Sequence, residues 1–239
     1  MSKQHPIISV AGSSDAGTTR VKTTFDQISW RQGINAASIE GDALHRFDSQ
    51  TRKDELARLQ AVDDQTFSHF SLDTNELEKL EDIFRIHGET GHGQTRHYVH
   101  DDDEAERWGA LPGAFTDWAP FGEGSDLLFY ESLHGAVESG RVNLAMLPDL
   151  KIGVVPIVNL EWIQKIHRET ASRCPSSEAA TDTILHRMHA YAPCICPQFT
   201  QTDISFPRAP AGRSVFCPSA VVWVWGEGGT GDASVGSGC

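Results

Sequence analysis

The sequence predicts an α/β fold in which a mixed, mostly parallel sheet is flanked by helices. Two observations lead to this prediction. Short apolar, β-branched runs alternate with segments of helical periodicity, which is the pattern of βαβ units. A glycine-rich loop also lies between the first apolar run and the first helical segment. In open α/β sheets such a loop, at the carboxyl end of a strand, is where ligands bind.

Four segments are expected to form strands. Residues 7–10 are a short β-branched run that Gly12 ends. Apolar runs bounded by turn residues are typical of strands buried on both faces of a parallel sheet. The other three expected strands are residues 36–39, 127–130 and 152–158, the last of which contains Pro156.

Five segments are expected to form helices. Residues 18–30 carry apolar side chains at helical spacing, and Gly33 follows as a stop signal. Residues 75–86 place Leu77 and Leu80 on one face. The remaining expected helices are residues 55–62, 159–170 and 178–191.

The composition is that of a globular protein. A length of 239 residues allows one or two domains, and 39% apolar with 22% charged residues excludes wholesale disorder. The formal charge of −13 argues against binding nucleic acid or an anionic membrane through bulk charge. No apolar stretch approaches the roughly 18 residues of a membrane span. The N-terminus lacks the pattern of a secretion signal, so a cytoplasmic location is expected.

The C-terminal segment has a different composition. Residues 207–239 contain only four charged residues but seven of the 21 glycines. All five cysteines lie at or after Cys174, and an odd number without a secretion signal indicates free thiols. We therefore expect one domain over residues 1–206 and a divergent, glycine-rich tail over residues 207–239.

The loop after the first strand matches the phosphate-binding pattern G-x-x-x-x-G-K-[ST], except that Thr18 replaces the lysine. Backbone amides of such a loop and of the following helix bind phosphate without a lysine. The Thr19 hydroxyl would then bind Mg²⁺. A tight strand–helix turn is the alternative, and the position between a strand and a helix favours the nucleotide site. The expected nucleotide-binding residues are Gly12, Ser13, Ser14, Asp15, Ala16, Gly17, Thr18, Thr19 and Arg20.

Two carboxylates follow predicted strands. Asp42 comes just after the second strand, where a carboxylate can accept a proton from a substrate hydroxyl during phosphoryl transfer. His45 and Arg46 would hold a substrate phosphate; a polar helix-capping loop is the alternative. Glu131 follows the third strand, a position typical of an acid on the Mg²⁺ side of a nucleotide site.

A basic segment follows the fourth strand. Arg168 and Arg173 are placed to close over a transferring phosphoryl group as a lid. The alternative is a solvated basic helix face, which is the commoner use of such charges.

Six segments together resemble the phosphoribulokinase family, in its proteobacterial Calvin-cycle form. They are residues 12–18, 38–47, 66–70, 98–102, 129–136 and 159–168. The resemblance extends over about residues 1–206. It implies a P-loop kinase fold and phosphorylation of ribulose 5-phosphate at its 1-hydroxyl, giving ribulose 1,5-bisphosphate, with ATP and Mg²⁺. It also implies a homo-oligomer and an allosteric response to NADH and AMP.

The resemblance also implies roles for individual residues. Asp42 would be the base that activates the attacking hydroxyl. The other implied groups contact the sugar phosphate (His45, Tyr98, His100), lie on the metal–nucleotide side (Glu131, Glu169) or stabilise charge on the transferring group (Lys165, Arg168, Arg173).

This sequence departs from the family pattern at four positions. Asp15 and Cys174 stand where the family has glycine, Ser49 where it usually has arginine, and Glu169 where it has aspartate. A catalytically impaired nucleotide-binding or assembly subunit is therefore one alternative. A uridine-kinase-like enzyme of the same fold is another. Because the resemblance stops abruptly near residue 206, we also expect a frameshift or sequencing error there.

Overall fold

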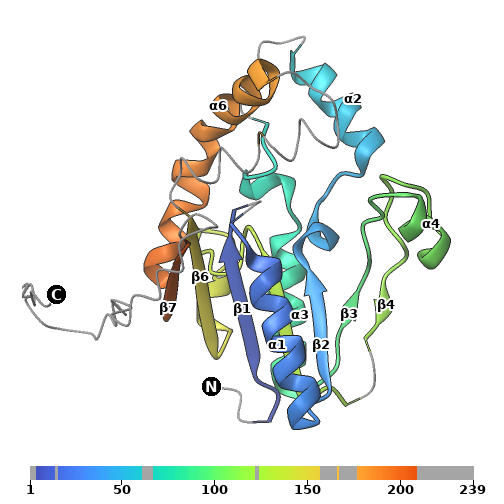
Figure 1. The fold of residues 1–239 in the computed structure, drawn as a ribbon, viewed down its shortest axis with the longest axis vertical. Coiled ribbons are helices and arrows are strands. Elements are labelled where there is room, and N and C mark those ends of the chain that lie inside the picture. Colours follow the sequence, from blue (N-terminus) through green and yellow to red (C-terminus); the bar gives the residue numbers. More distant parts are fainter. Residues whose placement is uncertain are drawn as a thin grey trace, which may run out of the picture.

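A computed structural model describes residues 4–13, 16–60, 67–121, 124–156, 166 and 177–208. Its centre is a five-stranded sheet of order β2-β5-β1-β6-β7, shown in Figure 1. All four neighbouring pairs in this sheet are parallel, as the alternation of strands and helices predicts. Its strands are β1 (Ile7–Gly12), β2 (Ala36–Glu40), β5 (Leu127–Ser132), β6 (Leu150–Pro156) and β7 (Ile204–Arg208).

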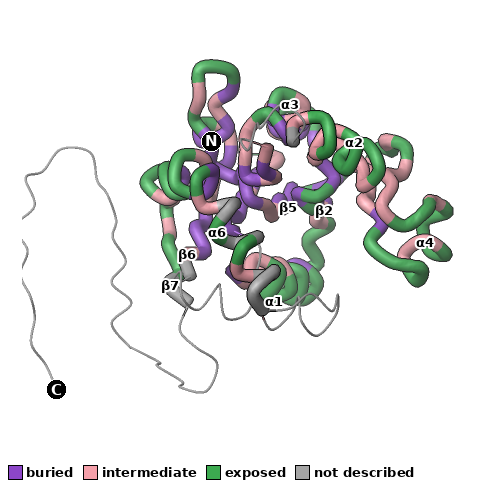
Figure 2. The backbone as a smooth tube through the Cα atoms, turned by 90° about the horizontal axis from the view of Figure 1, so that it is seen from above, coloured by how far each residue is buried: buried purple, intermediate pink, exposed green. Residues whose placement is uncertain are grey.

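Helices lie on both faces of this sheet, as the view from above shows (Figure 2). The helices in the described part of the chain are α1 (Thr18–Gln32), α2 (Ser49–Gln60), α3 (Leu77–Thr90), α4 (Asp102–Trp108) and α6 (Ser177–Cys194). Short 3-10 helices occur at Gly41–Leu44, Leu72–Thr74, Leu144–Met146 and Cys196–Gln201. Strands β3 (Gln94–Thr95) and β4 (Ala119–Pro120) form a separate antiparallel pair. None of the described helices is both long and apolar enough to cross a membrane.

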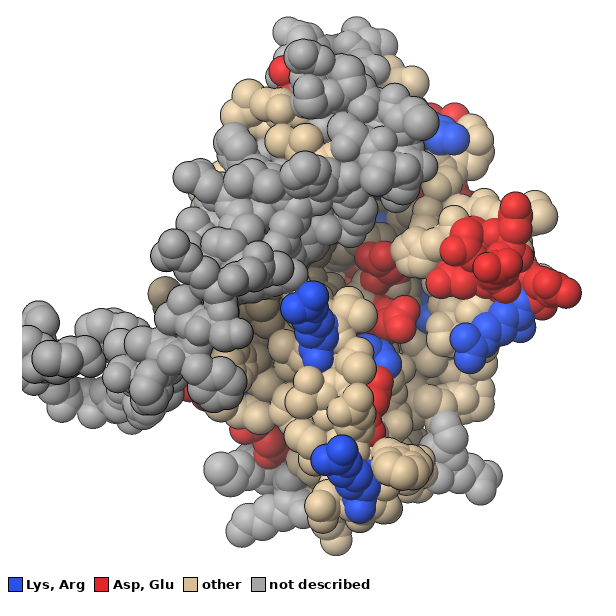
Figure 3. All heavy atoms as spheres, in the orientation of Figure 1, with Lys and Arg blue, Asp and Glu red and all other residues tan. Residues whose placement is uncertain are grey.

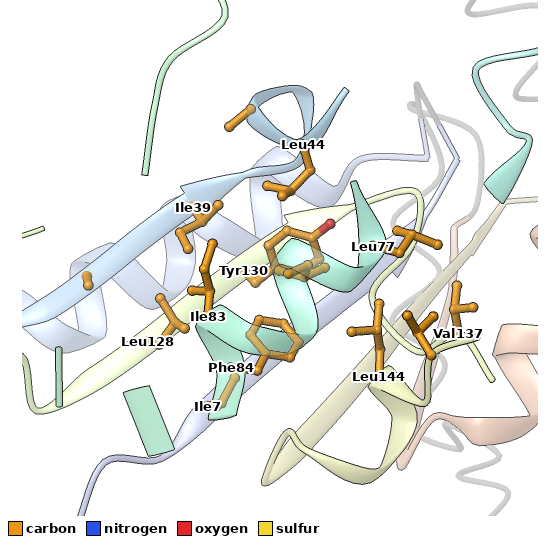
Figure 4. Packing of buried hydrophobic residues seen from close by; sticks show 14 residues of the cluster. Ile7, Ile39, Leu44, Leu77, Ile83, Phe84, Leu128, Tyr130, Val137 and Leu144 are labelled. Carbon is orange, nitrogen blue, oxygen red and sulfur yellow. The ribbon is translucent and has the colours of Figure 1, made fainter. Parts of the chain in front are cut away.

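Two apolar layers hold the helices against the sheet. On one face, Leu128 and Tyr130 of β5 pack against α3 (Figure 4). The rings of Phe84 and Tyr130 meet edge to face, with centroids 5.4 Å apart. On the other face, Phe129 packs against Phe25 of α1. Alternate residues of β5 thus point to opposite layers, which explains why this strand is apolar at every position from 127 to 130.

The expected central strands and helices are confirmed, with some different bounds. Helix α2 begins at Ser49 and not at residue 55, because Asp48 caps it: Asp48 Oδ1 accepts a hydrogen bond from the Thr51 amide at 2.7 Å. Strand β7 pairs with β6 and was not predicted; it crosses the expected domain boundary at residue 206. The expected helix at 159–170 lies outside the described residues apart from 166, as does nearly all of the segment 207–239.

Candidate active site

A cavity of about 370 Å³ opens at the carboxyl ends of β1, β2 and β5. These ends meet because the strands are parallel and in register, so that Glu40 lies beside Glu131 and Ala11 beside Ser132. The cavity is lined by Gly12, Ser13, Thr18, Thr19, Glu40, Gly41, Asp42, His69, His100, Glu104, Glu131, Ser132 and Leu133. Figure 3 shows carboxylates in the middle of this side of the molecule.

The glycine-rich loop forms one wall. A Cβ atom on Gly12 would lie 2.8 Å from Thr18 Cγ2 and 3.1 Å from the Val154 carbonyl oxygen, so only glycine fits where the loop leaves the sheet. Gly17 has a φ of 100°, a left-handed conformation that favours glycine. This conformation turns the chain directly into α1.

The start of α1 is suited to bind an anion. No side chain caps this helix, and its first turn contains no acidic residue. The amides of a helix N-terminus and the helix dipole attract phosphate. Beside it, the Ser13 hydroxyl is buried and has no hydrogen-bond partner among the described residues. Ser14 and Asp15 lie outside the described residues, and Arg20 is exposed on α1.

Glu131 faces this loop from the end of β5. Its Oε1 accepts a long hydrogen bond from Thr19 Oγ1 at 3.5 Å, while its Oε2 is buried and has no partner in the part of the chain that the structure describes. Burial raises the pKa of Glu131, although a hydrogen bond from Thr18 opposes this, and the nearby charge of Glu40 raises it further. A cation would satisfy the free oxygen and reverse this shift.

These residues fit Mg²⁺ bound together with a nucleotide. Mg²⁺ usually takes one or two protein ligands and completes its octahedron with water and phosphate oxygens. Glu131 and Thr19 supply two oxygens at the phosphate side of the cavity. Within the described ranges, no cluster of three or more acidic, histidine or cysteine side chains is arranged to hold a metal ion by itself. Glu169, the other expected metal ligand, lies outside those ranges.

Asp42 stands opposite the loop, in the 3-10 helix that follows β2. A Cβ atom on the preceding residue, Gly41, would collide with Ser132, so glycine is required to bring this turn against β5. Two imidazoles flank the Asp42 carboxylate: His45 Nε2 lies 3.0 Å from Oδ1, and His100 Nε2 lies 3.4 Å from Oδ2. The carboxylate is thus fixed on both sides.

The surroundings of Asp42 keep it ionised. Burial by itself would raise the pKa of Asp42, but the hydrogen bond from His45 and the charges of His45, His100 and Arg52 outweigh burial. The net result is a lowered pKa. Asp42 is therefore a proton acceptor at neutral pH.

His45 is held in turn by Asn75, which is buried. The Asn75 Nδ2 donates to the carbonyl oxygens of His69 and Ser71 at 3.1 and 2.9 Å. Carbonyl oxygens only accept, so the amide has one orientation and its Oδ1 faces His45 Nδ1 at 3.0 Å. The proton of this hydrogen bond must then reside on His45 Nδ1, and Nε2 is the nitrogen that faces Asp42.

His100 is positioned by two neighbours. Its amide donates to Glu104 Oε2 at 2.8 Å, and its ring meets the Tyr98 ring edge to face, with centroids 4.9 Å apart. Tyr98 does not line the cavity; its hydroxyl shares a hydrogen bond of 2.7 Å with Ser49 Oγ at the start of α2. Tyr98 is therefore placed to act through His100.

Of the remaining expected site residues, only Arg46 is described. Arg46 donates to the carbonyl oxygens of Asp73 and Asn75 at 3.0 and 3.2 Å, and it is not part of the cavity lining. Its role in substrate binding stays a prediction. The positions of Lys165, Arg168 and Arg173 lie outside the described residues, as does that of Cys174.

Sequence reasoning missed five polar residues of the site. Glu40, His69, Glu104 and Ser132 line the cavity, and Asn75 orients His45. His69 falls within a segment that the family resemblance contains, which was the available signal. Nothing local in the sequence marks Glu104 or Asn75, because each acts on a residue brought near it only by the fold.

Comparison with known proteins agrees with this geometry. A model of the Phosphoribulokinase / Uridine kinase family matches residues 7–213. Phosphoribulokinase 1 of Cereibacter sphaeroides is 64% identical over 210 residues, which cover 88% of this chain and 72% of that protein. The phosphoribulokinase of Nitrobacter vulgaris is 56% identical over the same shares of the two chains.

Solved structures share this fold as well. The phosphoribulokinase from Rhodobacter spheroides matches with a TM-score of 0.77 and 60% identity, over 87% of this chain and 71% of that one. A putative fructose transport system kinase from a Silicibacter species matches with a TM-score of 0.59 at 14% identity, which shows a shared fold alone. The family model matches most of the chain, and these relatives are more than 50% identical to it. The chain therefore belongs to the Phosphoribulokinase / Uridine kinase family.

Proposed function

We propose that this protein is a phosphoribulokinase that uses ATP to phosphorylate ribulose 5-phosphate at its 1-hydroxyl, in the Calvin cycle. The observation that carries the proposal is the placement of an ionised carboxylate, Asp42, opposite an uncapped helix N-terminus in one cavity. Such a cavity can hold a triphosphate at one wall and a substrate hydroxyl at the other. The level of identity to phosphoribulokinases supports this choice of substrate over a nucleoside.

Asp42 acts as the base. As the 1-hydroxyl oxygen forms its bond to the γ-phosphorus, the bond from that phosphorus to the β,γ-bridging oxygen breaks and ADP leaves. The hydroxyl proton passes to Asp42. Phosphoryl transfer has a loose transition state in most analyses, so this proton is lost late and a carboxylate of lowered pKa is adequate. His45 and His100 keep its two oxygens aligned.

Nucleotide binding falls to the loop Gly12–Thr19 and the start of α1. Their backbone amides would hold the phosphates, with Ser13, Thr18 and Thr19 as hydroxyl donors along the same wall. Mg²⁺, when bound by Glu131 and Thr19, neutralises charge on the phosphate oxygens. Lys165, Arg168 and Arg173 would add positive charge over the transferring group, and Glu169 would approach from the same segment.

We also propose an oligomeric state, two regulatory nucleotides and a cellular location for this protein. The family resemblance supports a homo-oligomer, allosteric regulation by NADH and AMP, and a cytoplasmic location. Sedimentation velocity tests the oligomer, and titration of activity with each nucleotide tests regulation. A single monomeric species, or rates that neither nucleotide changes, would contradict these two proposals.

Replacing Asp42 by asparagine tests the proposed chemistry. A general base contributes about 10²- to 10⁴-fold to the rate, so kcat for ribulose 5-phosphate should fall by at least about 100-fold. Asp103→Asn is the matched control, because it removes an exposed carboxylate of α4 that does not line the cavity. Equal rates for the two variants would refute the role of Asp42. ATP binding by folded wild-type protein without turnover would favour the non-catalytic subunit instead.

A further inference from the structure

Gln198 is a buried polar residue that the proposed reaction does not use. It lies in the 3-10 helix that follows α6, and only 3% of it is exposed. Its Oε1 accepts a hydrogen bond from the Ala136 amide at 3.1 Å, and its Nε2 donates to the Leu133 and Cys194 carbonyl oxygens, each at 2.9 Å. One side chain thus joins the end of α6 to both ends of the turn 133–136, which follows β5.

The turn 133–136 affects the cavity because the two residues before it belong to the cavity lining. Glu131 faces the phosphate loop there, and Ser132 packs directly against Gly41, the residue before Asp42. A shift at the start of this turn therefore reaches Glu131 on one wall of the cavity and Asp42 on the other.

Apolar packing holds this turn without fixing its direction. Leu133 lies in a buried apolar cluster with residues of α6, and such contacts are not directional. Hydrogen bonds are directional. Gln198 supplies two of them to the turn, and Ser9 of β1 supplies a third by donating to the Gly135 carbonyl oxygen at 2.6 Å. Gln198 is the side chain that holds the start of the turn, next to the cavity.

Gln198 acts through geometry and not through charge. The imidazole of the turn, His134, is 1% exposed, and its Nδ1 lies 3.3 Å from Gln198 Nε2. Burial and the nearby charge of His45 lower the pKa of His134 to about 3, although the neighbouring His69 carbonyl oxygen opposes this. His134 is therefore uncharged at neutral pH and gives no proton to the reaction.

We propose that Gln198 is a positioning residue for the phosphoryl transfer: it fixes the turn 133–136, so that Glu131 and Asp42 keep their places on opposite walls of the cavity. This rests on the proposed function and adds to it a residue that lies outside the cavity lining. A misplacement of about 1 Å, caused far from the reacting atoms, costs up to about 100-fold in rate. Loss of the Gln198 amide should therefore lower kcat in protein that remains folded.

Gln198→Leu tests the proposal, with Ser125→Ala as the matched control. Ser125 is also buried, and its hydroxyl pairs with His87 Nε2 at 3.0 Å and with the Gly91 carbonyl oxygen at 2.9 Å. It lies just before β5 begins, at the end of that strand away from the cavity. Each variant leaves buried polar groups unpaired, so both should lose stability to urea. At a temperature where both are folded, kcat for ribulose 5-phosphate should fall about 10- to 100-fold in Gln198→Leu and by less than about twofold in Ser125→Ala.

Gln198→Glu is a second variant, which keeps the shape of the side chain. One of its oxygens replaces Nε2 and faces the Leu133 and Cys194 carbonyl oxygens, so the buried carboxyl should keep its proton well above its usual pH range and donate to one of them in that form. The ratio of its kcat to that of the wild type should therefore rise as the pH falls from about 9 to about 6. The ratio for Ser125→Ala should stay level. If Gln198→Leu does not fold, this profile decides, and a level ratio for Gln198→Glu would overturn the proposal.

Calorimetric titration with ATP, with and without Mg²⁺, examines the site in the absence of the sugar. Because Glu131 is the proposed Mg²⁺ ligand, the affinity gained on adding Mg²⁺ should be smaller in Gln198→Leu than in the wild type, and unchanged in Ser125→Ala. This comparison needs no turnover, so it separates failure of this proposal from failure of the proposed reaction. Equal kcat and an equal effect of Mg²⁺ in wild type and Gln198→Leu would show that Gln198 has no positioning role.

Discussion

Asn75 provides the most demanding prediction of the site's geometry. Its buried amide takes part in four hydrogen bonds, with His45 Nδ1, the His69 and Ser71 carbonyl oxygens, and Thr74 Oγ1. At about 1 kcal/mol each, these bonds sum to about 4 kcal/mol. Water entering the space left by Asn75→Ala would recover part of this. We expect the free energy of unfolding to fall by about 2–4 kcal/mol, which a domain of ordinary stability survives.

The same substitution should change which nitrogens of His45 carry a proton. With Asn75 present, its Oδ1 accepts a hydrogen bond from Nδ1, and Asp42 Oδ1, 3.0 Å from Nε2, accepts one from Nε2. Without Asn75, only Nε2 keeps a fixed acceptor, so Nδ1 should be the nitrogen that loses its proton. Asn75→Asp keeps an oxygen acceptor at this place, so it should retain the proton on Nδ1 even though it is also destabilised.

Two measurements check these expectations. Urea unfolding gives the loss of stability, with Asn35→Ala as the control, because Asn35 is exposed and its side chain makes one hydrogen bond, to Gly124. That control should cost less than about 1 kcal/mol. Nitrogen-15 NMR of the histidine rings at pH 8 shows which ring nitrogens carry a proton, with His45→Gln identifying the signal among 11 histidines. Unchanged His45 ring shifts in Asn75→Ala would refute the reasoning.

Three further predictions follow from the loop, the core and the tail. Gly12→Ala should raise KM for ATP and destabilise the fold by about 1–3 kcal/mol, because the new methyl would press on Thr18 and the Val154 carbonyl; a normal KM for ATP would contradict this. Burial lowers the pKa of His87 from its ordinary value of 6.5 to about 4. As the pH falls, His87 therefore takes up a proton earlier in the unfolded chain than in the folded one, and about 3 kcal/mol of folding stability should be lost between pH 6.5 and 4. In His87→Gln the urea midpoint should fall less steeply with decreasing pH than in wild type. Translating the coding DNA in its other two frames should reveal sequence typical of the family's C-terminal region after about residue 206, and its absence from both frames would refute the frameshift.

The central fold was predictable because its signals are local. Each central strand is a short apolar run with its own turn residues, and the glycine-rich loop lies within eight consecutive positions. The start of α2 was misplaced because its first turn carries few apolar residues and the capping role of Asp48 was not considered. Strand β7 depends on parallel pairing with β6 across about 50 residues, and no local pattern reports such pairing.

The reactive side chains of the site were predictable from the sequence, but the hydrogen bonds that position them were not. Asp42, His45 and Glu131 follow predicted strands and have the residue types that phosphoryl transfer requires. The hydrogen bond from His45 to Asn75 joins residues 30 positions apart, and Ser49 meets Tyr98 across 49 positions. These contacts form only in the folded chain, so no local sequence pattern predicts them.

Phosphorus-31 NMR of one reaction mixture tests the central claim most directly. Wild-type protein is incubated with ATP, Mg²⁺ and ribulose 5-phosphate, and both products are followed together. The account predicts one ribulose 1,5-bisphosphate for each ADP, and a rate at least about 100-fold lower with Asp42→Asn. Release of ADP with inorganic phosphate in place of the bisphosphate, or no change in the spectrum with folded protein, would contradict it.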